Sequence, residues 1–137
     1  MGPTLHLLIV TPESIALDEH VNLVTLPCIQ GQIGIYPLHV PLITHMVPGE
    51  ASFEKDGKET FLAVGEGIVG ISADEVSIVT DMAIAADNID AAKAEEARQR
   101  AATRLREKLS DEEVASVNAS LVRSLAQLQV KRRRRTV

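Results

Sequence analysis

Hydrophobic and polar residues follow two different patterns along this chain. Up to residue 87, apolar side chains alternate with polar ones over short runs, as in strands that bury one face. From residue 88 onward they recur every three or four positions, as in helices that bury one face. The sequence therefore predicts an α+β protein, with an N-terminal β-sandwich over residues 1–87 and a C-terminal antiparallel two-helix hairpin over residues 88–137.

The first region contains many short predicted strands separated by turn residues. Strands are predicted at residues 5–10 with a continuation at 15–17, and at residues 21–26, 51–55, 59–64, 67–72 and 76–80. Asp18–His20 is predicted as a turn, and Asp56–Gly57 is predicted as the turn of a hairpin. Gly31–Tyr36 is predicted as a short, tightly turning segment. Many short strands at regular spacing indicate a small sandwich or barrel.

The second region predicts two helices. The first would run from Asn88 to Lys108, with Asp87 or Asn88 as its N-cap, and the second would begin at a capping box, Ser110–Glu113. Their apolar stripes are Ala94, Ala97, Ala101, Leu105 and Leu109 on the first helix and Val114, Val117, Leu121, Leu125 and Leu128 on the second. Because two helices bury little by themselves, we expect the hairpin to rest weakly on the β region or on a partner, as a movable element would.

One motif matches a nucleotide-binding pattern, but its context argues against that function. Residues 65–70 read Gly-Glu-Gly-Ile-Val-Gly and fit the G-x-G-x-x-G pattern of dinucleotide-binding folds. That pattern needs a helix that begins at the glycines, whereas residues 71–80 are predicted as strands. The glycines are therefore expected to serve a bulge or a close strand contact.

Composition argues against several kinds of chemistry. Aromatic residues make up 2% of the chain, so we expect an aliphatic core and no base-stacking surface for nucleic acid. The one cysteine, Cys28, allows neither an internal disulfide nor a cysteine-based zinc site. The histidines are scattered and no acid, base or nucleophile converges, so we expect neither catalysis nor a metal site. No apolar run approaches about 20 residues and no basic leader is present, so we expect no membrane span and no export signal.

Charge is distributed unevenly. Residues 1–87 hold 2 basic and 12 acidic side chains, and residues 88–137 hold 12 basic and 7 acidic ones. Two regions of opposite net charge attract each other and can favour different partners. Random drift in the composition of solvated surfaces would also produce this distribution. Lys93, Arg100 and Arg104 share one helix face and indicate an anionic partner, with a solvated face as the alternative. The run Lys131–Arg135 could bind nucleic acid, but a frayed, solvated end near acidic protein or anionic lipid is favoured.

Residues 31–42 carry the most specific family resemblance. They read Gly-Gln-Ile-Gly-Ile-Tyr-Pro-Leu-His-Val-Pro-Leu, which resembles the G-x-[IF]-G-[IV]-x-x-x-H-x-P-L signature of the epsilon subunit of F-type ATP synthase, called delta in mitochondria. Residues 65–69 with 76–81 resemble the family's next block, and residues 89–94 with 124–130 its helical hairpin. The sequence departs at Leu38, where the family usually has Gly, at Lys93, where it usually has Arg, and at Gln127, where nucleotide-binding members have Arg.

The resemblance implies a non-catalytic rotor subunit that couples proton or sodium translocation to ATP synthesis. The sandwich would dock on the gamma subunit and the ring of c subunits, with Gln32, His39 and Pro41 at that interface. The hairpin would be regulatory, moving between a compact form and an extended form that blocks ATP hydrolysis. The chain would be peripheral, reaching the cytoplasmic face of a bacterial inner membrane, or an organelle membrane, only through the complex.

The resemblance also implies roles for hairpin residues. Arg98, Arg100 and Arg104 would contact the alpha/beta catalytic head. The family's ATP-contacting positions correspond here to Ile89, Asp90, Lys93, Ala94, Arg100 and Arg123. An ATP-sensing module is therefore the alternative function, with ATP as a weak regulatory ligand and no required cofactor. No nucleic-acid partner is expected.

Overall fold

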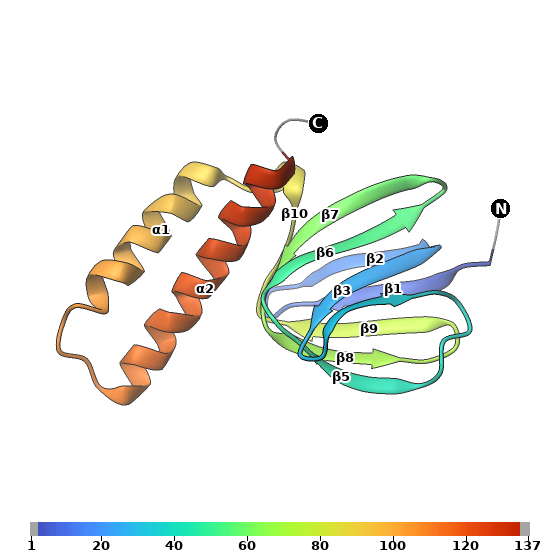
Figure 1. Cartoon of the computed structure of the whole chain (residues 1–137), viewed down its shortest axis with the longest axis horizontal. Helices are drawn as coiled ribbons and strands as arrows, with labels where there is room; N and C mark the ends of the chain where they lie inside the picture. Colours follow the sequence, from blue (N-terminus) through green and yellow to red (C-terminus); the bar gives the residue numbers. More distant parts are fainter. Residues whose placement is uncertain (1–2, 135–137) are drawn as a thin grey trace.

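The computed structural model describes residues 3–134 and places a β-sandwich beside a helical hairpin (Figure 1). The strands are β1 (Leu5–Val10), β2 (Ile15–Val21), β3 (Leu23–Cys28), β4 (Gly31–Ile35), β5 (Leu42–Met46), β6 (Gly49–Lys55), β7 (Lys58–Val64), β8 (Gly67–Ile71), β9 (Glu75–Thr80) and β10 (Ala83–Ala85). A short 3-10 helix, η1 (Ala86–Asn88), leads to helices α1 (Ala91–Arg104) and α2 (Asp111–Arg134). The predicted fold class is confirmed.

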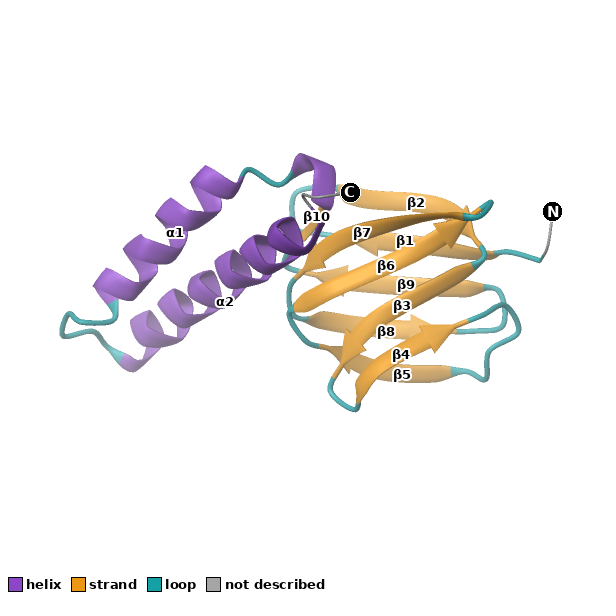
Figure 2. Cartoon of the chain, turned by 45° about the horizontal axis from the view of Figure 1, so that its top comes forward, coloured by secondary structure: helices purple, strands orange, loops and turns teal. Residues whose placement is uncertain are grey.

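Hydrogen bonds join the strands into one sheet that folds over on itself. Its order is β10-β7-β6-β3-β5-β8-β9-β1-β2, and β4 pairs with β3. Strands β1 and β9 run parallel, whereas neighbours such as β6 with β7 and β8 with β9 run antiparallel. One layer holds β10, β7, β6, β3 and β4, and the other holds β5, β8, β9, β1 and β2 (Figure 2).

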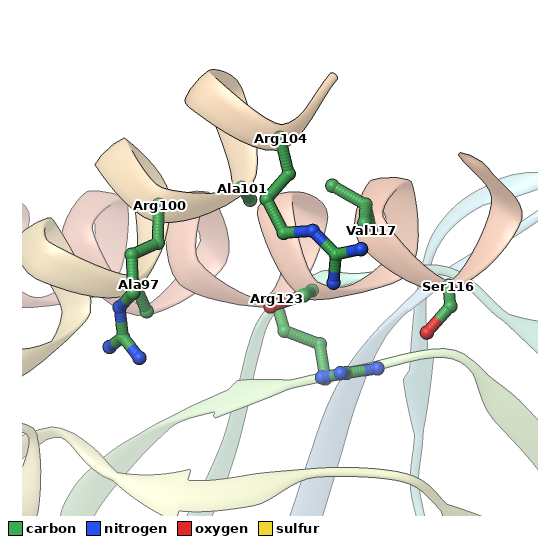
Figure 3. A pocket seen from close by; sticks show the side chains of 8 residues that line it. Ala97, Arg100, Ala101, Arg104, Ser116, Val117 and Arg123 are labelled. Carbon is green, nitrogen blue, oxygen red and sulfur yellow. The ribbon is translucent and has the colours of Figure 1, made fainter. Parts of the chain in front are cut away.

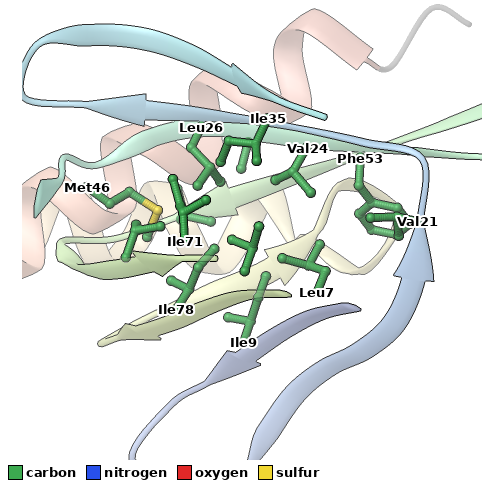
Figure 4. Packing of buried hydrophobic residues seen from close by; sticks show 14 of the residues in the cluster. Leu7, Ile9, Val21, Val24, Leu26, Ile35, Met46, Phe53, Ile71 and Ile78 are labelled. Atoms are coloured by element: carbon green, nitrogen blue, oxygen red, sulfur yellow. The ribbon is translucent and has the colours of Figure 1, made fainter. Parts of the chain in front are cut away.

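Aliphatic side chains fill the space between the two layers (Figure 4). In β1, Leu5, Leu7 and Ile9 are each 1% exposed, and the residues between them are half-buried. Met46 and Phe53 extend the same core from β5 and β6. Burial of each such side chain stabilises the fold by about 1.5–3 kcal/mol, so the sandwich has a substantial core of its own.

The hairpin is attached to the sandwich mainly through α2. This helix packs against β6, β7 and η1, whereas α1 packs chiefly against α2. The turn between the helices is closed by the predicted capping box, which is confirmed. The Glu113 amide donates to Ser110 Oγ at 3.2 Å, and the Ser110 amide donates to Glu113 Oε1 at 3.3 Å.

The region between the first two predicted strands differs from the prediction. Residues 15–21 form the single strand β2, which pairs antiparallel with β1, so Asp18–His20 do not form a turn. β2 lies at the edge of the sheet, where alternating polar side chains can face water. Residues 31–35 are also a strand, β4, paired with β3 beyond the turn at Ile29–Gln30. The sequence does not predict β5, because prolines flank it on both sides.

The glycine motif at residues 65–70 lies in strand context, as predicted. Residues 67–71 form β8, antiparallel to β9. A Cβ added to Gly67 would lie 2.3 Å from the carbonyl oxygen of Val79, so this glycine permits a close strand contact. The dinucleotide interpretation has no helix to support it at this position.

Helix α1 is shorter than the predicted span from Asn88 to Lys108. Its N-cap is Asp90, not Asp87 or Asn88: the Asp90 carboxylate accepts a hydrogen bond from the Lys93 amide at 3.1 Å. The preceding Ile89 is buried in an extended conformation against the sandwich, which keeps the chain out of the helix until Ala91. Because the helix ends at Arg104, Leu105 and Leu109 of the predicted stripe lie outside it. Ala94 and Ala101 are the members of the stripe that α1 buries.

Helix α2 buries a different face from the one predicted. Val117 is buried as expected, but Leu125 is 46% exposed, and Ala126 and Val130 are buried in its place. The reason is that α2 contacts both α1 and the sandwich, so a single stripe does not describe it. The basic residues 131–134 continue the helix and do not fray, whereas residue 135 of that predicted run lies outside the described residues.

Candidate functional site

A cavity of about 480 Å³ lies between the two helices and is lined by three arginines (Figure 3). Arg100 and Arg104 reach it from α1 and Arg123 from α2. The remaining lining residues are small or aliphatic: Ala97, Ala101, Ser116, Val117 and Ser120. Because these short side chains do not fill the space between the helices, the guanidinium groups border an open, positively charged hollow.

Two of these arginines already have carboxylate partners. Arg123 donates to Asp81 of the sandwich at 3.2 Å, and Arg104 donates to Glu113 at 3.4 Å. Hydrogen bonds from Ser110, together with the nearby Arg104 charge, lower the pKa of Glu113. Among residues 3–134, Arg100 has no carboxylate within salt-bridge distance and is exposed. The cavity can therefore accept an anion, with Arg100 as its uncompensated charge.

The predicted ATP-binding residues do not all meet in this cavity. Arg100 and Arg123 line it, but Ile89 is buried against the sandwich and Asp90 caps α1. Lys93 is exposed on the first turn of α1, and the buried Ala94 lies beside it in sequence. Neither lines the cavity. Arg104, which the resemblance assigns to the inhibitory contact, also lines the cavity beside Arg100. Residues 97, 100 and 104 of α1 follow one another in steps of three and four and therefore share a helix face.

The three arginines expected at an inhibitory contact differ in their surroundings. Arg98 donates to Glu95 through both Nε, at 3.1 Å, and Nη2, at 2.5 Å. This pairing lowers the pKa of Glu95. Glu96 lies four residues before Arg100 on α1, but the two side chains form no ion pair among the described residues. Arg98 is therefore largely compensated within its own helix, and Arg100 and Arg104 face the hollow.

The residues expected at the stalk interface do not form one cluster. Gln32 is exposed on β4 beside the β3–β4 turn, where it pairs with Pro27. His39 and Pro41 lie in the loop after the other end of β4. That loop is tied to the β8–β9 turn by a 2.6 Å hydrogen bond from the Leu38 amide to the Ala73 carbonyl. Gln32 and the His39 loop thus mark opposite ends of one strand.

The sequence does not predict an apolar surface on the outside of the sandwich. Ile43, Ile68 and Val79 are 79%, 55% and 62% exposed and come from the neighbouring strands β5, β8 and β9. Ile68 and Val79 are direct cross-strand partners. A usable signal was present, since residues 67–71 place apolar side chains on both faces of a strand. Exposed apolar residues gathered on one sheet face suit contact with another protein.

Two further features bear on membrane and metal binding. Within residues 3–134, no helix is both long and apolar enough to cross a bilayer. In the same part of the chain, no group of three or more His, Cys, Asp or Glu side chains could hold a metal ion.

Comparisons with known proteins agree with this architecture. The profile described as "ATP synthase, Delta/Epsilon chain, beta-sandwich domain" matches residues 4–86, and the profile of the family's long alpha-helix domain matches residues 87–132. The chain is 38% identical over 127 residues to the ATP synthase epsilon chain of Herpetosiphon aurantiacus, with 93% of each chain covered. It is 35% identical over 133 residues to the epsilon chain of Alkalilimnicola ehrlichii, covering 96% of this chain and 95% of that one.

Solved structures show the same fold. A chain from the mitochondrial ATP synthase of Euglena gracilis, OSCP/F1/c-ring, superposes with a TM-score of 0.74 at 19% identity, covering 94% of this chain and 81% of that one. A chain from the central stalk/c-ring of Tetrahymena thermophila mitochondrial ATP synthase has a TM-score of 0.62 at 14% identity, covering 93% and 96%. With both family profiles and the curated relatives in agreement, the chain belongs to the delta/epsilon chain family of ATP synthase subunits, as an F-type epsilon subunit.

Proposed function

We propose that this chain is a non-catalytic rotor subunit of the central stalk, which couples ion translocation to ATP synthesis and restrains ATP hydrolysis through its hairpin. Its sandwich docks on the gamma subunit and the c-ring, and its hairpin reaches the alpha/beta catalytic head. Family membership supports this role, as do relatives of the same fold from assemblies described as F1/c-ring and central stalk/c-ring. The chain is thereby peripheral, on the cytoplasmic face of a bacterial inner membrane or on an organelle membrane.

The attachment of the hairpin carries the regulatory part of the proposal. Among the described residues, the apolar part of the contact between α2 and the sandwich is small and is formed by Ala126 and Val130 with Ala63, Met82 and Ile89. Helix α1 packs chiefly on α2 and adds little to this contact. An element held by so small an apolar contact can leave the sandwich without unfolding its core.

Two surfaces of the sandwich support docking. The exposed apolar face of Ile43, Ile68 and Val79 suits a protein partner such as gamma. Gln32 extends from one end of β4, which suits the polar loops of the c-ring, and the loop of His39 and Pro41 lies at the other end. In this assignment the two predicted interface groups contact different partners.

Removal of residues 88–137 tests the inhibitory role. The truncated chain should still assemble into the complex, and the ATPase rate of that complex should rise above that of the complex with the full chain. An unchanged rate in a fully assembled complex would contradict the inhibitory role and leave the coupling role standing.

The cavity between the helices favours a second candidate function, ATP sensing. Arg100 and Arg123 line it together, and a guanidinium fork suits phosphate oxygens. Equilibrium dialysis of the isolated chain should then detect ATP at millimolar concentration. Arg100→Ala with Arg123→Ala should weaken that binding at least about tenfold, whereas Lys93→Ala should leave it unchanged. Absence of binding would rule out the sensor function.

A further inference from the structure

The C-terminal end of α2 contacts Glu50 and Phe61 on the outer surface of the sandwich. Arg134 donates to both carboxylate oxygens of Glu50 in β6, from Nε at 3.1 Å and from Nη2 at 2.5 Å. The same guanidinium lies 3.5 Å from the centre of the Phe61 ring in β7. Arg133 lies nearby, with Nη1 3.6 Å from Glu50. Bidentate pairing and stacking on an aromatic ring are the two contacts that the planar guanidinium makes best.

The Glu50–Arg134 pair is less exposed than the ion pair that Arg123 forms with the sandwich. The side chain of Glu50 is 16% exposed and that of Arg134 is 26% exposed. In the other ion pair across the same interface, Arg123 and Asp81 are 34% and 40% exposed and share a single hydrogen bond. Water screens the Glu50 pair less, so it makes the larger contribution to docking.

The apolar part of the interface cannot substitute for it. The α2 side chains buried against the sandwich are Ala126 and Val130, which are small and cover a correspondingly small area. We propose that Glu50 and Phe61 form a binding site for Arg134, and we call the contact of these three residues the clasp. Breaking the clasp is the step that frees the hairpin from the sandwich. This inference rests on the proposed function, because the clasp is the contact that controls the movement of the hairpin.

Glu50 is a better target than Arg134 for testing the clasp. Loss of Arg134 leaves Arg133 within reach of the carboxylate, so a replacement pair can form. Loss of charge at Glu50 removes the partner of both arginines at once and changes no residue of the helix itself. Glu50→Gln therefore separates release of the hairpin from fraying of α2. Glu54→Gln on the same strand and Arg132→Ala, an exposed position in the same basic run, are matched controls.

Thiol labelling of the full chain measures the opening. A cysteine placed at Ala126 is protected while α2 is docked, and the native Cys28 in the sandwich core reacts only when the sandwich opens. In the protein with cysteine at position 126, Glu50→Gln should accelerate labelling at that position roughly tenfold, as expected from the loss of a charge-assisted bidentate pair. The labelling rate of Cys28 should stay the same. The controls should change it less than twofold. The helical circular dichroism signal should remain unchanged.

The outcomes separate this inference from the proposed function. An unchanged rate at position 126 in Glu50→Gln would overturn the clasp, and so would equal acceleration in Glu54→Gln or Arg132→Ala. Parallel acceleration of Cys28 would also overturn it, because Glu50 would then support the sandwich as a whole. The labelling uses the isolated chain, so its failure leaves the ATPase prediction for the assembled complex intact. Failure of the ATPase prediction likewise leaves the clasp intact.

Discussion

Gly65 leaves the space that the carboxylate of Asp81 occupies. A Cβ added to Gly65 would lie 1.8 Å from Asp81 Oδ1, and the other oxygen of the same carboxylate accepts a hydrogen bond from Arg123 at 3.2 Å. The Gly65 amide also donates to the Met82 carbonyl at 2.9 Å. The first glycine of the misleading dinucleotide pattern thus positions a residue that α2 contacts.

Gly65→Ala should therefore destabilise the protein and loosen α2. The Asp81 carboxylate must turn away from the added methyl group, which breaks its hydrogen bond with Arg123. For so exposed a pair this costs about 0.2–1 kcal/mol in the free energy of unfolding, which urea denaturation measures. Gly70→Ala is the matched control in the same motif, because a Cβ there would meet no atom within 4 Å. Equal stability of the two variants would contradict the steric role of Gly65.

Asp90→Ala should weaken α1 because it removes the N-cap. The expected loss is about 1 kcal/mol, and Asp90→Ser should restore most of it, because serine also caps helices well. Thermal unfolding followed by circular dichroism measures both. If Asp90 served ATP binding and not capping, the alanine variant would show no loss in the absence of nucleotide.

Inhibition of hydrolysis should depend on Arg100 and Arg104 more than on Arg98. Arg98 is paired with Glu95 inside α1, whereas Arg100 and Arg104 line the hollow between the helices. Replacing Arg100 and Arg104 with alanine should weaken inhibition of the complex roughly tenfold, as expected for two partly exposed charges, and reduce its salt sensitivity. Arg98→Ala is the comparison, and ATPase assays over a range of KCl concentrations provide the measurement. Full inhibition by the double variant would contradict an electrostatic contact.

Stability should depend on the protonation of His6. Its pKa is raised above the ordinary value of 6.5, chiefly by a hydrogen bond to Asp18, with Glu75 as a further acidic neighbour. His20 stacks on the same ring at 5.1 Å. A raised pKa in the folded state means that the stabilisation is complete below about pH 6.5 and is lost as the pH rises through the folded value. The urea concentration at the midpoint of unfolding should therefore decrease as the pH is raised from about 6 to about 8, and this decrease should be absent in His6→Gln. Asp18→Asn should show the same loss of pH dependence as His6→Gln.

Local sequence patterns predicted the elements whose partners lie nearby in the chain. A short apolar run that ends at Thr11-Pro12 was sufficient for β1, and a capping box was sufficient for the start of α2, because both signals are local. The hairpin at Asp56–Gly57 follows from its turn residues, and both have positive φ as that turn requires. Fold class followed from these elements together.

Long-range contacts explain what the sequence could not predict. Asp18 and Glu19 read as turn residues, yet their strand is held by register with β1 and by the Lys55–Glu19 ion pair. The buried face of α2 depends on contact with the sandwich, which no helical period encodes. The cavity likewise needs Arg100 and Arg123 from two helices, and only their packing brings them together. The clasp joins Glu50 to Arg134 across 84 positions of sequence.

The apolar contact beneath α2 gives the docked hairpin a particular response to temperature. Ala63 is 0% exposed and Val130 is 1% exposed, so each departure of the helix must hydrate both side chains. Hydration of apolar groups becomes less unfavourable on cooling, and the hydration of charged groups such as Glu50 becomes more favourable. Both contributions weaken docking in the cold, so chilling should bring the hairpin away from the sandwich.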